Sequence, residues 1–190
     1  MKLISDRQRQ IMDAFFMLVD EVDEPRKISM EMIAGRVGIR RQSIYEKHFS
    51  SVSDLMTTIF ELVSSPCELK IQAYFAGDKS QDFFDFFAQE ILPLLYEKRD
   101  WLKLLYSKVI AASWSDFAQR TYLPYVEAYL KDFPNETGLS DRFRSDLLVR
   151  QVIAIVASWL TSEKVEPASL FAPRFLDLLG KSSLDLIGKS

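Results

Sequence analysis

The sequence predicts an all-α protein, with a small N-terminal helical domain followed by a larger helical domain. Apolar side chains recur at the 3.6-residue spacing of an amphipathic helix along most of the chain. Glycine provides only 6 of the 190 residues, and no alternating run is joined by an Asn-Gly or Asp-Gly turn, so no β-hairpin is indicated. Apolar residues make up 48% and charged residues 27%, which is a globular composition rather than that of a disordered chain.

The first helix is predicted to begin at Ser5, because Ser5 and Gln8 have the spacing of a capping box. A run of acidic residues over 20–24, followed by Pro25, is expected to end it, since the position before a proline disfavours helix. The apolar face of this helix contains Ile11, Phe15, Leu18, Val19 and Val22.

Two short helices are expected to follow. Ser29 is a favourable N-cap for the second helix, and Gly38 suits the left-handed turn that ends it. A third helix is predicted over about 40–47. Two short helices joined by a glycine turn, with the small Ala34 where they approach each other, have the form of a helix-turn-helix. The side chains expected to hold this pair against the first helix are Ile33, Val37, Ile39 and Ile44.

A fourth helix is predicted to begin at Ser51, which has Asp54 three residues later. We expect it to end within 64–67, because Pro66 cannot donate the backbone hydrogen bond that continues a helix. This break sets the expected domain boundary, with one domain over 1–63 and a second over 64–190. The buried face of the fourth helix is predicted to contain Leu55, Ile59, Leu62 and Val63.

The second domain is rich in aromatic residues and reads as helical almost throughout. Pro93 and Pro124 fall inside two of its helical patterns and should kink or break them. The predicted helical segments are 67–76, 79–98, 100–113, 116–132, 140–163 and 167–188.

Several functional classes are disfavoured by composition. The net charge of −3 argues against binding nucleic acid through bulk positive charge, but it permits a local basic patch. The single cysteine, Cys67, excludes an internal disulfide and a multi-cysteine zinc site, and is expected to be a small buried or half-buried apolar residue. With one histidine, one cysteine and no glycine-rich loop, the sequence predicts no enzyme, no metal site and no cofactor.

The sequence also predicts a cytoplasmic protein. The first ten residues, MKLISDRQRQ, lack the apolar core of a signal peptide. The longest uncharged run, over 151–162, is 12 residues, which is too short to span a bilayer and typical of a buried helix.

The helix-turn-helix is locally basic in an acidic chain. The segment from Pro25 to Phe49 contains six Lys and Arg side chains and two Glu side chains, which gives a local net charge of +4 (6 − 2). The third helix is predicted to present Arg40, Arg41, Gln42, Ser43 and Lys47 outward. Arginine pairs with guanine and glutamine with adenine in the major groove, so these residue types suit base recognition. The alternative is a solvated basic face on a purely structural helical hairpin.

Residues 9–63 resemble the DNA-binding domain of the tetracycline-repressor (TetR-type) family. The resemblance rests on Ile11, Phe15, Phe16, Ser29, Ile33, Ala34, Val37, Gly38, Ile39, Ser43, Ile44, Tyr45, His48, Phe49, Ser51, Asp54 and Leu55. It implies a homodimer with an N-terminal DNA-binding unit and an all-helical C-terminal domain that binds a small effector. The phosphate or base contacts that it implies are those of Ser29, Arg41, Ser43, Tyr45 and His48.

Two positions depart from the family pattern. Arg40 stands where the family often has a small hydroxyl residue that caps the recognition helix, and Val52 stands where it often has a phosphate-binding lysine. For His48, a lone histidine is no metal site, and the two interpretations are donation to a phosphate and a surface histidine packed on Tyr45. These departures leave the operator sequence undetermined.

The segment from Leu147 to Leu160 has 11 apolar residues in 14, so both of its sides need cover. A two-fold dimer interface and the centre of a monomeric bundle explain this pattern equally well. The resemblance favours the dimer, with an interface through Val152, Val156, Trp159, Phe175 and Leu179.

Aromatic side chains over 83–129 predict either a ligand pocket or a solid core. A pocket would be lined by Phe87, Ile91, Trp101, Tyr106, Trp114, Phe117, Tyr122 and Tyr125. The sequence as a whole therefore favours a homodimeric regulator, expected to be a repressor, that leaves double-stranded operator DNA when a small apolar or aromatic effector binds. The alternative is a helix-turn-helix protein without a small-molecule ligand, regulated through a protein partner.

Overall fold

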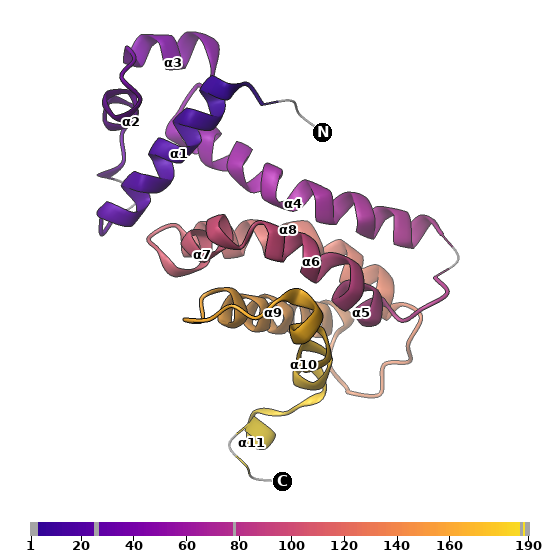
Figure 1. Cartoon of the computed structure of the whole chain (residues 1–190). Helices are drawn as coiled ribbons and strands as arrows, with labels where there is room; N and C mark the ends of the chain where they lie inside the picture. Colours follow the sequence, from indigo (N-terminus) through magenta and orange to yellow (C-terminus); the bar gives the residue numbers. More distant parts are fainter. Residues whose placement is uncertain (1–3, 25–26, 78, 187, 189–190) are drawn as a thin grey trace.

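The computed structural model describes residues 4–24, 27–77, 79–186 and 188, and over these residues the chain is helical with no strand (Figure 1). The predicted all-α fold, with an N-terminal helix-turn-helix unit and a C-terminal helical domain, is confirmed. The helices are α1 (Asp6–Glu21), α2 (Met30–Val37), α3 (Arg41–Lys47), α4 (Val52–Ala76), α5 (Phe83–Phe86), the π-helix η2 (Phe87–Ile91), α6 (Leu92–Glu97), α7 (Arg99–Ser107), α8 (Ala111–Leu130), α9 (Asp141–Leu160), α10 (Ala168–Gly180) and α11 (Ser183–Leu186).

The beginning of α1 has the predicted capping box. Ser5 Oγ accepts from the Gln8 backbone N–H at 3.2 Å, and Gln8 Oε1 accepts from the Ser5 backbone N–H at 3.1 Å. These two bonds satisfy donors that have no partner within the helix. The helix ends at Glu21 with Val22 as C-cap, whereas Pro25, which we expected to stop it, lies outside the described residues.

The turn between α2 and α3 depends on Gly38. Its φ of +75° and ψ of 34° are left-handed, a conformation that a side chain would strain. Ile39 N–H then bonds to Ala34 O at 3.0 Å, which closes the end of α2. Ile33 and Ile44 have no exposed surface and lie in the core of this unit, in which α2 packs on both α1 and α3, whereas Val37 and Ile39 are only half-buried.

The expected break at Pro66 is wrong. Helix α4 runs without interruption for 25 residues from its Ser51 cap, with Pro66 in its interior. A proline removes one backbone hydrogen bond, but its fixed φ is helical, so burial on both sides of it can hold the helix together. Ile59 and Ile71 are both fully or almost fully buried, one before Pro66 and one after it. The two expected domains are thus joined by a shared helix, which extends from the helix-turn-helix along the C-terminal domain in Figure 1.

The predicted helix over 79–98 is divided into three pieces. The π-helix η2 lies between α5 and α6, and the N–H of Leu92 bonds to Phe87 O, five residues back. Pro93 follows in the first turn of α6, so its missing backbone N–H falls directly after the π-helix and not inside a regular α-helix. Pro124, in contrast, lies inside the continuous helix α8 and does not break it.

The C-terminal domain is built on the packing of α8 against α9, the most extensive helix pair in the fold. Helix α10 covers η2, α6 and α9, and the Phe171 ring stacks on Trp159 with centroids 4.4 Å apart. The helix predicted over 167–188 ends at Gly180, and the short α11 follows it away from the domain (Figure 1).

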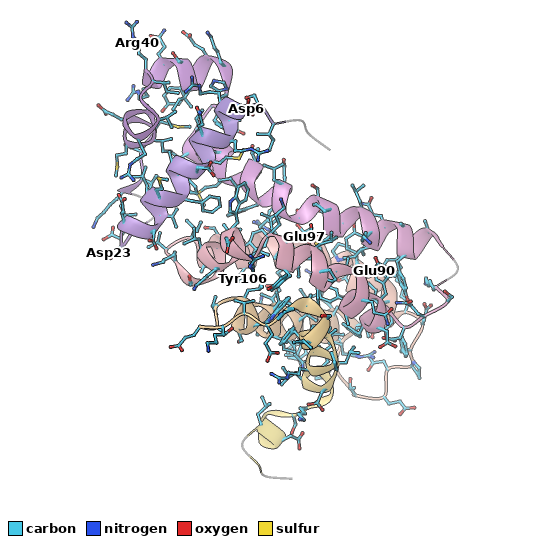
Figure 2. The ribbon with its side chains drawn as sticks, viewed as in Figure 1. Asp6, Asp23, Arg40, Glu90, Glu97 and Tyr106 are labelled. Carbon is cyan, nitrogen blue, oxygen red and sulfur yellow. The ribbon has the colours of Figure 1, made fainter. Side chains whose placement is uncertain are left out.

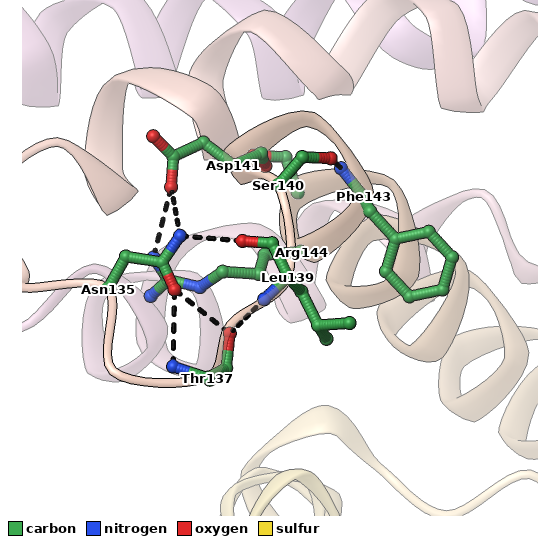
Figure 3. Close-up of polar contacts among 8 residues, drawn as sticks. Asn135, Thr137, Leu139, Ser140, Asp141, Phe143 and Arg144 are labelled. Carbon is green, nitrogen blue, oxygen red and sulfur yellow. Dashed lines mark hydrogen bonds and ion pairs between the residues drawn. The ribbon is translucent and has the colours of Figure 1, made fainter.

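The loop between α8 and α9 is closed by its own polar side chains (Figure 3). Asn135 Nδ2 donates to Leu139 O at 2.7 Å and to Asp141 Oδ1 at 2.8 Å. Ser140 caps α9 by accepting from Phe143 N–H at 3.2 Å. These contacts fix the start of α9 without a contribution from the core. No helix within the described ranges is both long and apolar enough to cross a membrane.

Candidate nucleic-acid interface and ligand cavity

Helix α3 has one exposed face and is held in place by one buried residue, Ile44. Ile44 has no exposed surface, and it holds the helix against the core of the helix-turn-helix unit. Ser43 and His48 are half-buried, and the remaining predicted DNA-contacting residues are exposed: Ser29, Arg40, Arg41, Gln42, Tyr45 and Lys47. Figure 2 shows Arg40 at the outer edge of the molecule, directed away from the C-terminal domain.

Arg40 is the N-cap of α3, and its side chain makes no capping hydrogen bond. This agrees with the expectation that an arginine here weakens the cap, and it leaves the guanidinium directed outward. Ser29, by contrast, is the working N-cap of α2, where its Oγ accepts from Met32 N–H at 3.3 Å. Because the Ser29 hydroxyl uses only its oxygen in this bond, its own hydrogen is available to donate to a phosphate.

Two contacts along α3 hold its outward side chains in place. Gln42 Nε2 donates to Glu46 Oε1 at 2.7 Å, one turn along the helix. The Arg41 guanidinium lies 5.7 Å from the centroid of the Tyr45 ring, within cation–π range. The Gln42 bond uses one N–H of its amide, so its second N–H and its Oε1 remain for pairing with a base.

The charge of the unit is distributed less evenly than the sequence suggested. Arg36 is held by Glu21 through two bonds, at 2.9 and 2.6 Å, and this pairing lowers the pKa of Glu21. Lys27 pairs with Glu24 at 3.3 Å, and Arg26 lies outside the described residues. Of the described cations in this segment, those without an ion pair are Arg40, Arg41 and Lys47, all on or beside α3.

His48 ends α3 as its C-cap and is half-buried. Its pKa is lowered, first by burial and then by the positive charges of Arg7 and Lys47. Arg7 belongs to the first turn of α1, so the structure brings a further cation beside α3. Sequence reasoning did not assign Arg7 to this surface, although its position within the basic segment "DRQR" was the available signal.

The C-terminal domain encloses an aromatic cavity of about 50 Å³. Six of the eight predicted lining residues meet there, namely Phe87, Ile91, Tyr106, Trp114, Tyr122 and Tyr125. The π-helix contributes Phe87 and Ile91, and α4 contributes Val63 and Ile71. No lining residue is charged, so the cavity suits an apolar occupant.

The other two predicted lining residues lie elsewhere. The Trp101 ring packs on Phe16 of α1, with centroids 5.0 Å apart, and thus belongs to the contact between the domains. Phe117 stacks on Trp114 at 5.8 Å and packs on Phe60 at 5.4 Å, behind the cavity wall. Their helices were predicted, but the face that each ring occupies depends on packing between helices.

Three hydroxyl and thiol groups near the cavity are held in their neutral forms. Burial raises the pKa of Tyr106 to about 12 and that of Cys67 to about 12. Burial likewise raises the pKa of Tyr122, which lies beside the Cys67 thiol. Cys67 is 1% exposed, which confirms that it is a buried apolar residue. Tyr106 and Tyr122, which line the cavity, therefore add hydrogen-bonding capacity to it without adding charge.

The residues predicted for a dimer interface are largely covered by their own chain, although Trp159 borders the surface groove on α9 and α10. Val156, Trp159 and Phe175 are buried within their own chain, Leu179 is half-buried, and Val152 lines the internal cavity. The exposed apolar side chains of α9 and α10 are instead Phe143, Leu147 and Leu170, which are 55%, 53% and 63% exposed. Periodicity indicated that α9 needs cover on both sides, but it could not tell which side its own chain would cover.

Comparison with known proteins supports the fold. No protein-family model matches the chain, and no curated protein matches it in sequence. A solved structure described as "Dihydroxyacetone kinase operon activator DhaS" is similar to it, with a TM-score of 0.53 and 19% sequence identity over 92% of this chain and 94% of that one. At this identity the similarity establishes the fold alone. It agrees with the all-helical regulator fold that the resemblance to the tetracycline-repressor family implies.

Proposed function

We propose that this protein is a homodimeric DNA-binding transcriptional regulator of the tetracycline-repressor type. The observation that carries the proposal is the exposed face of α3, where Arg40, Arg41 and Lys47 have no ion-pair partner among the described residues while Ile44 anchors the helix. A short helix held in this way by a preceding helix and a glycine turn can enter the major groove. Side chains in its first turn then reach base edges, and those at its flanks reach phosphates.

The proposed dimer forms through the exposed apolar side chains of α9 and α10. Leu147 and Leu170 are each more than half exposed, and they lie on the two helices that also border a surface groove. A two-fold pairing of these helices gives a four-helix interface and places two copies of α3 on one face. To read two half-sites, the recognition helices must lie about 34–36 Å apart, one turn of DNA.

A test of the dimer uses charge in place of an exposed leucine. Leu170→Glu should yield a mass of one chain by light scattering at micromolar concentration, whereas the wild type yields two. Ser169→Glu, an exposed neighbour on the same helix whose side chain is polar already, is the matched control. A wild-type mass of one chain at this concentration would remove the homodimer from the proposal.

The proposed effector site is the aromatic cavity. Its wall includes Val63 and Ile71 of α4, the helix that begins in the DNA-binding unit. A ligand larger than the cavity of about 50 Å³ has to displace a wall, and displacement of α4 changes the spacing of the recognition helices. The coupling required between ligand and DNA is on the order of 1–3 kcal/mol. The expected direction is release from the operator, although the protein of similar fold is described as an activator.

The alternative is a regulator that senses no small molecule and responds to a protein partner. One observation favours it, since a cavity of about 50 Å³ is well below the 300–1,000 Å³ that is common for ligand pockets. One measurement distinguishes the two functions. A compound that binds the cavity changes operator affinity if the protein is an effector-controlled regulator, and leaves operator affinity unchanged if the protein responds to a protein partner.

The DNA-binding proposal is tested with the purified full chain. Selection from a random duplex library should enrich an inverted repeat, and Arg41→Ala should lose that enrichment. Glu61→Ala, an exposed substitution on the middle of α4 away from α3, serves as control. If the wild type enriches no sequence and binds random DNA no better than albumin does, the regulator proposal fails.

A further inference from the structure

A buried donor in the cavity wall has no hydrogen-bond partner among the described residues. The Trp114 side chain is 2% exposed and lines the cavity, and its Nε1–H has no hydrogen-bond partner in the described structure. Buried donors in native proteins are almost always paired, because an unpaired one loses its hydration without compensation. An unpaired donor in the wall of an apolar cavity therefore indicates an acceptor supplied from outside the protein.

The position of the Trp114 ring supports this. The ring stacks on Phe117, with centroids 5.8 Å apart and an interplanar angle of 22°, and meets the edge of Phe60 at 5.4 Å. These contacts hold the ring in one orientation. The nearest protein acceptor is the Tyr106 hydroxyl, which the indole N–H approaches closely enough to oppose the rise in the pKa of Tyr106 without reaching hydrogen-bonding geometry. Tyr106 is half-buried and also lines the cavity, so this edge of the Trp114 ring lies at the cavity wall.

The remaining wall defines what can accept from this donor. The lining side chains are aliphatic or aromatic, and none is charged. An anionic ligand would lose its hydration there without gaining a counter-charge, so a carboxylate or phosphate is excluded. A neutral ligand with one oxygen acceptor loses little on entry and satisfies the orphan donor. The volume of about 50 Å³ compares with roughly 150 Å³ for an apolar cavity that admits benzene, so a ring-sized ligand must move a wall.

We propose that the cavity binds a small neutral carbonyl compound, a ketone, aldehyde or ester, whose oxygen accepts from Trp114 Nε1 while its hydrocarbon part fills the aromatic space. This deepens the effector part of the proposed function and rests on it for its biological meaning.

The experiment uses probe pairs that have one shape and differ in one atom group. Acetophenone and α-methylstyrene differ only in carbonyl oxygen against methylene, and 3-pentanone and 2-ethyl-1-butene form a smaller pair of the same kind. Affinities are measured for the full-length wild type and Trp114→Phe, which removes the donor and keeps an aromatic ring. The ratio of ketone affinity to alkene affinity should fall by roughly fivefold in the variant, as expected for the loss of one hydrogen bond. Benzoate should bind neither protein.

A second measurement does not depend on the variant's stability. In the wild type labelled with ¹⁵N, the indole N–H signal of Trp114, one of three tryptophans, should move downfield with the ketone and not with the alkene. The signals of Trp101 and Trp159 serve as internal controls. An unchanged Trp114 signal at saturating ketone, an unchanged affinity ratio in Trp114→Phe, or no binding of either pair to the wild type would each overturn the proposal.

Operator binding separates this proposal from the proposed function. If the wild type binds an inverted repeat but no probe, the cavity proposal fails and the DNA-binding proposal stands. If the ketone binds through Trp114 but leaves operator affinity unchanged, the ligand site stands and its role as an effector site fails.

Discussion

The ring of Trp101 lies against the ring of Phe16, with centroids 5.0 Å apart and planes inclined by 42°. Trp101 belongs to α7 of the C-terminal domain, and Phe16 belongs to α1 of the helix-turn-helix unit. Five residues beyond Trp101, Tyr106 on the same short helix lines the cavity. Lys108, just after α7, adds an ion pair with Asp20 of α1 at 2.8 Å. The cavity and the helix-turn-helix unit are thus connected through α7 as well as through the shared helix α4.

We expect Trp101→Ala to weaken the coupling between ligand and DNA. Because Trp101 is only half-buried, the loss of stability should be about 1–3 kcal/mol, below the 3–5 kcal/mol typical of a fully buried tryptophan. Denaturant unfolding gives the stability, and operator affinity with and without a cavity ligand gives the coupling. Lys103→Ala, an exposed substitution on the same helix, is the control. Full coupling in Trp101→Ala would show that α4 transmits the signal alone.

On the proposed recognition surface, we expect different residues to read bases and to hold the DNA backbone. Arg41 lies in the first turn of α3, so Arg41→Ala should cost about 1–3 kcal/mol on the true operator and relax preference at one base pair in each half-site. Lys47 lies in the last turn, so Lys47→Ala should weaken all sequences alike and make the slope of log affinity against log salt shallower by about one for each phosphate that the variant no longer binds. A salt titration on operator and random DNA distinguishes them. The opposite pattern would reverse the two roles.

The affinity for DNA should depend on pH through His48. Burial and the charges of Arg7 and Lys47 lower the pKa of His48 in the free protein, so it is neutral at pH 7. A phosphate beside it favours the protonated form and raises its pKa, so binding takes up a proton and affinity should rise as the pH falls from about 7.5 to 5.5. His48→Asn should flatten this dependence. Equal slopes for the two proteins would show that His48 does not contact phosphate.

Folding changes the pKa of His48 in the opposite direction from phosphate binding. Since the pKa of His48 is lower in the folded protein than in the unfolded chain, its contribution to stability is present above the unfolded pKa of about 6.5 and is lost as the pH falls. Affinity and stability should therefore change in opposite directions with acidification, and urea unfolding at each pH provides the check on the binding curve.

Replacing the proline inside α4 should stabilise the protein. Pro66→Ala restores a backbone N–H in a helix that is already continuous, so the free energy of unfolding should rise by about 1–3 kcal/mol. The measurement is the midpoint of urea unfolding, compared between proteins whose unfolding free energy has the same dependence on urea concentration. A loss of stability would mean that the helix requires the shape imposed by Pro66, and the response of operator affinity to a ligand would then be expected to change as well.

Cys67 should be chemically inert in the folded protein. Its thiol is 1% exposed, and burial raises its pKa to about 12, so almost no thiolate is present at pH 8. Iodoacetamide at pH 8 should leave the native protein unlabelled and should label the protein fully in 6 M guanidinium. Rapid labelling of the native protein would show that α4 opens near the cavity.

The local features of the fold were predictable because neighbouring residues determine them. The Ser5 and Gln8 capping box, the Ser29 cap and the left-handed Gly38 each depend on a few consecutive residues, and all are present as the sequence indicated. The exposed basic face of α3 follows from the same short-range spacing, since burying Ile44 turns its neighbours outward.

Tertiary packing decided the features that the sequence left open. Pro66 stays inside α4 because burial before and after it outweighs one missing backbone bond, and that balance involves residues distant in the chain. Trp101 faces Phe16 rather than the cavity, and Val156 faces inward rather than toward a partner. The spacing of apolar residues in the sequence shows that a helix has an apolar face, but it does not show which other helix covers that face. The unpaired Nε1–H of Trp114 likewise emerges only when every nearby acceptor has been placed. The chain's own spacing determined which residues form helices, while contacts between distant helices determined which faces meet and where a cavity remains.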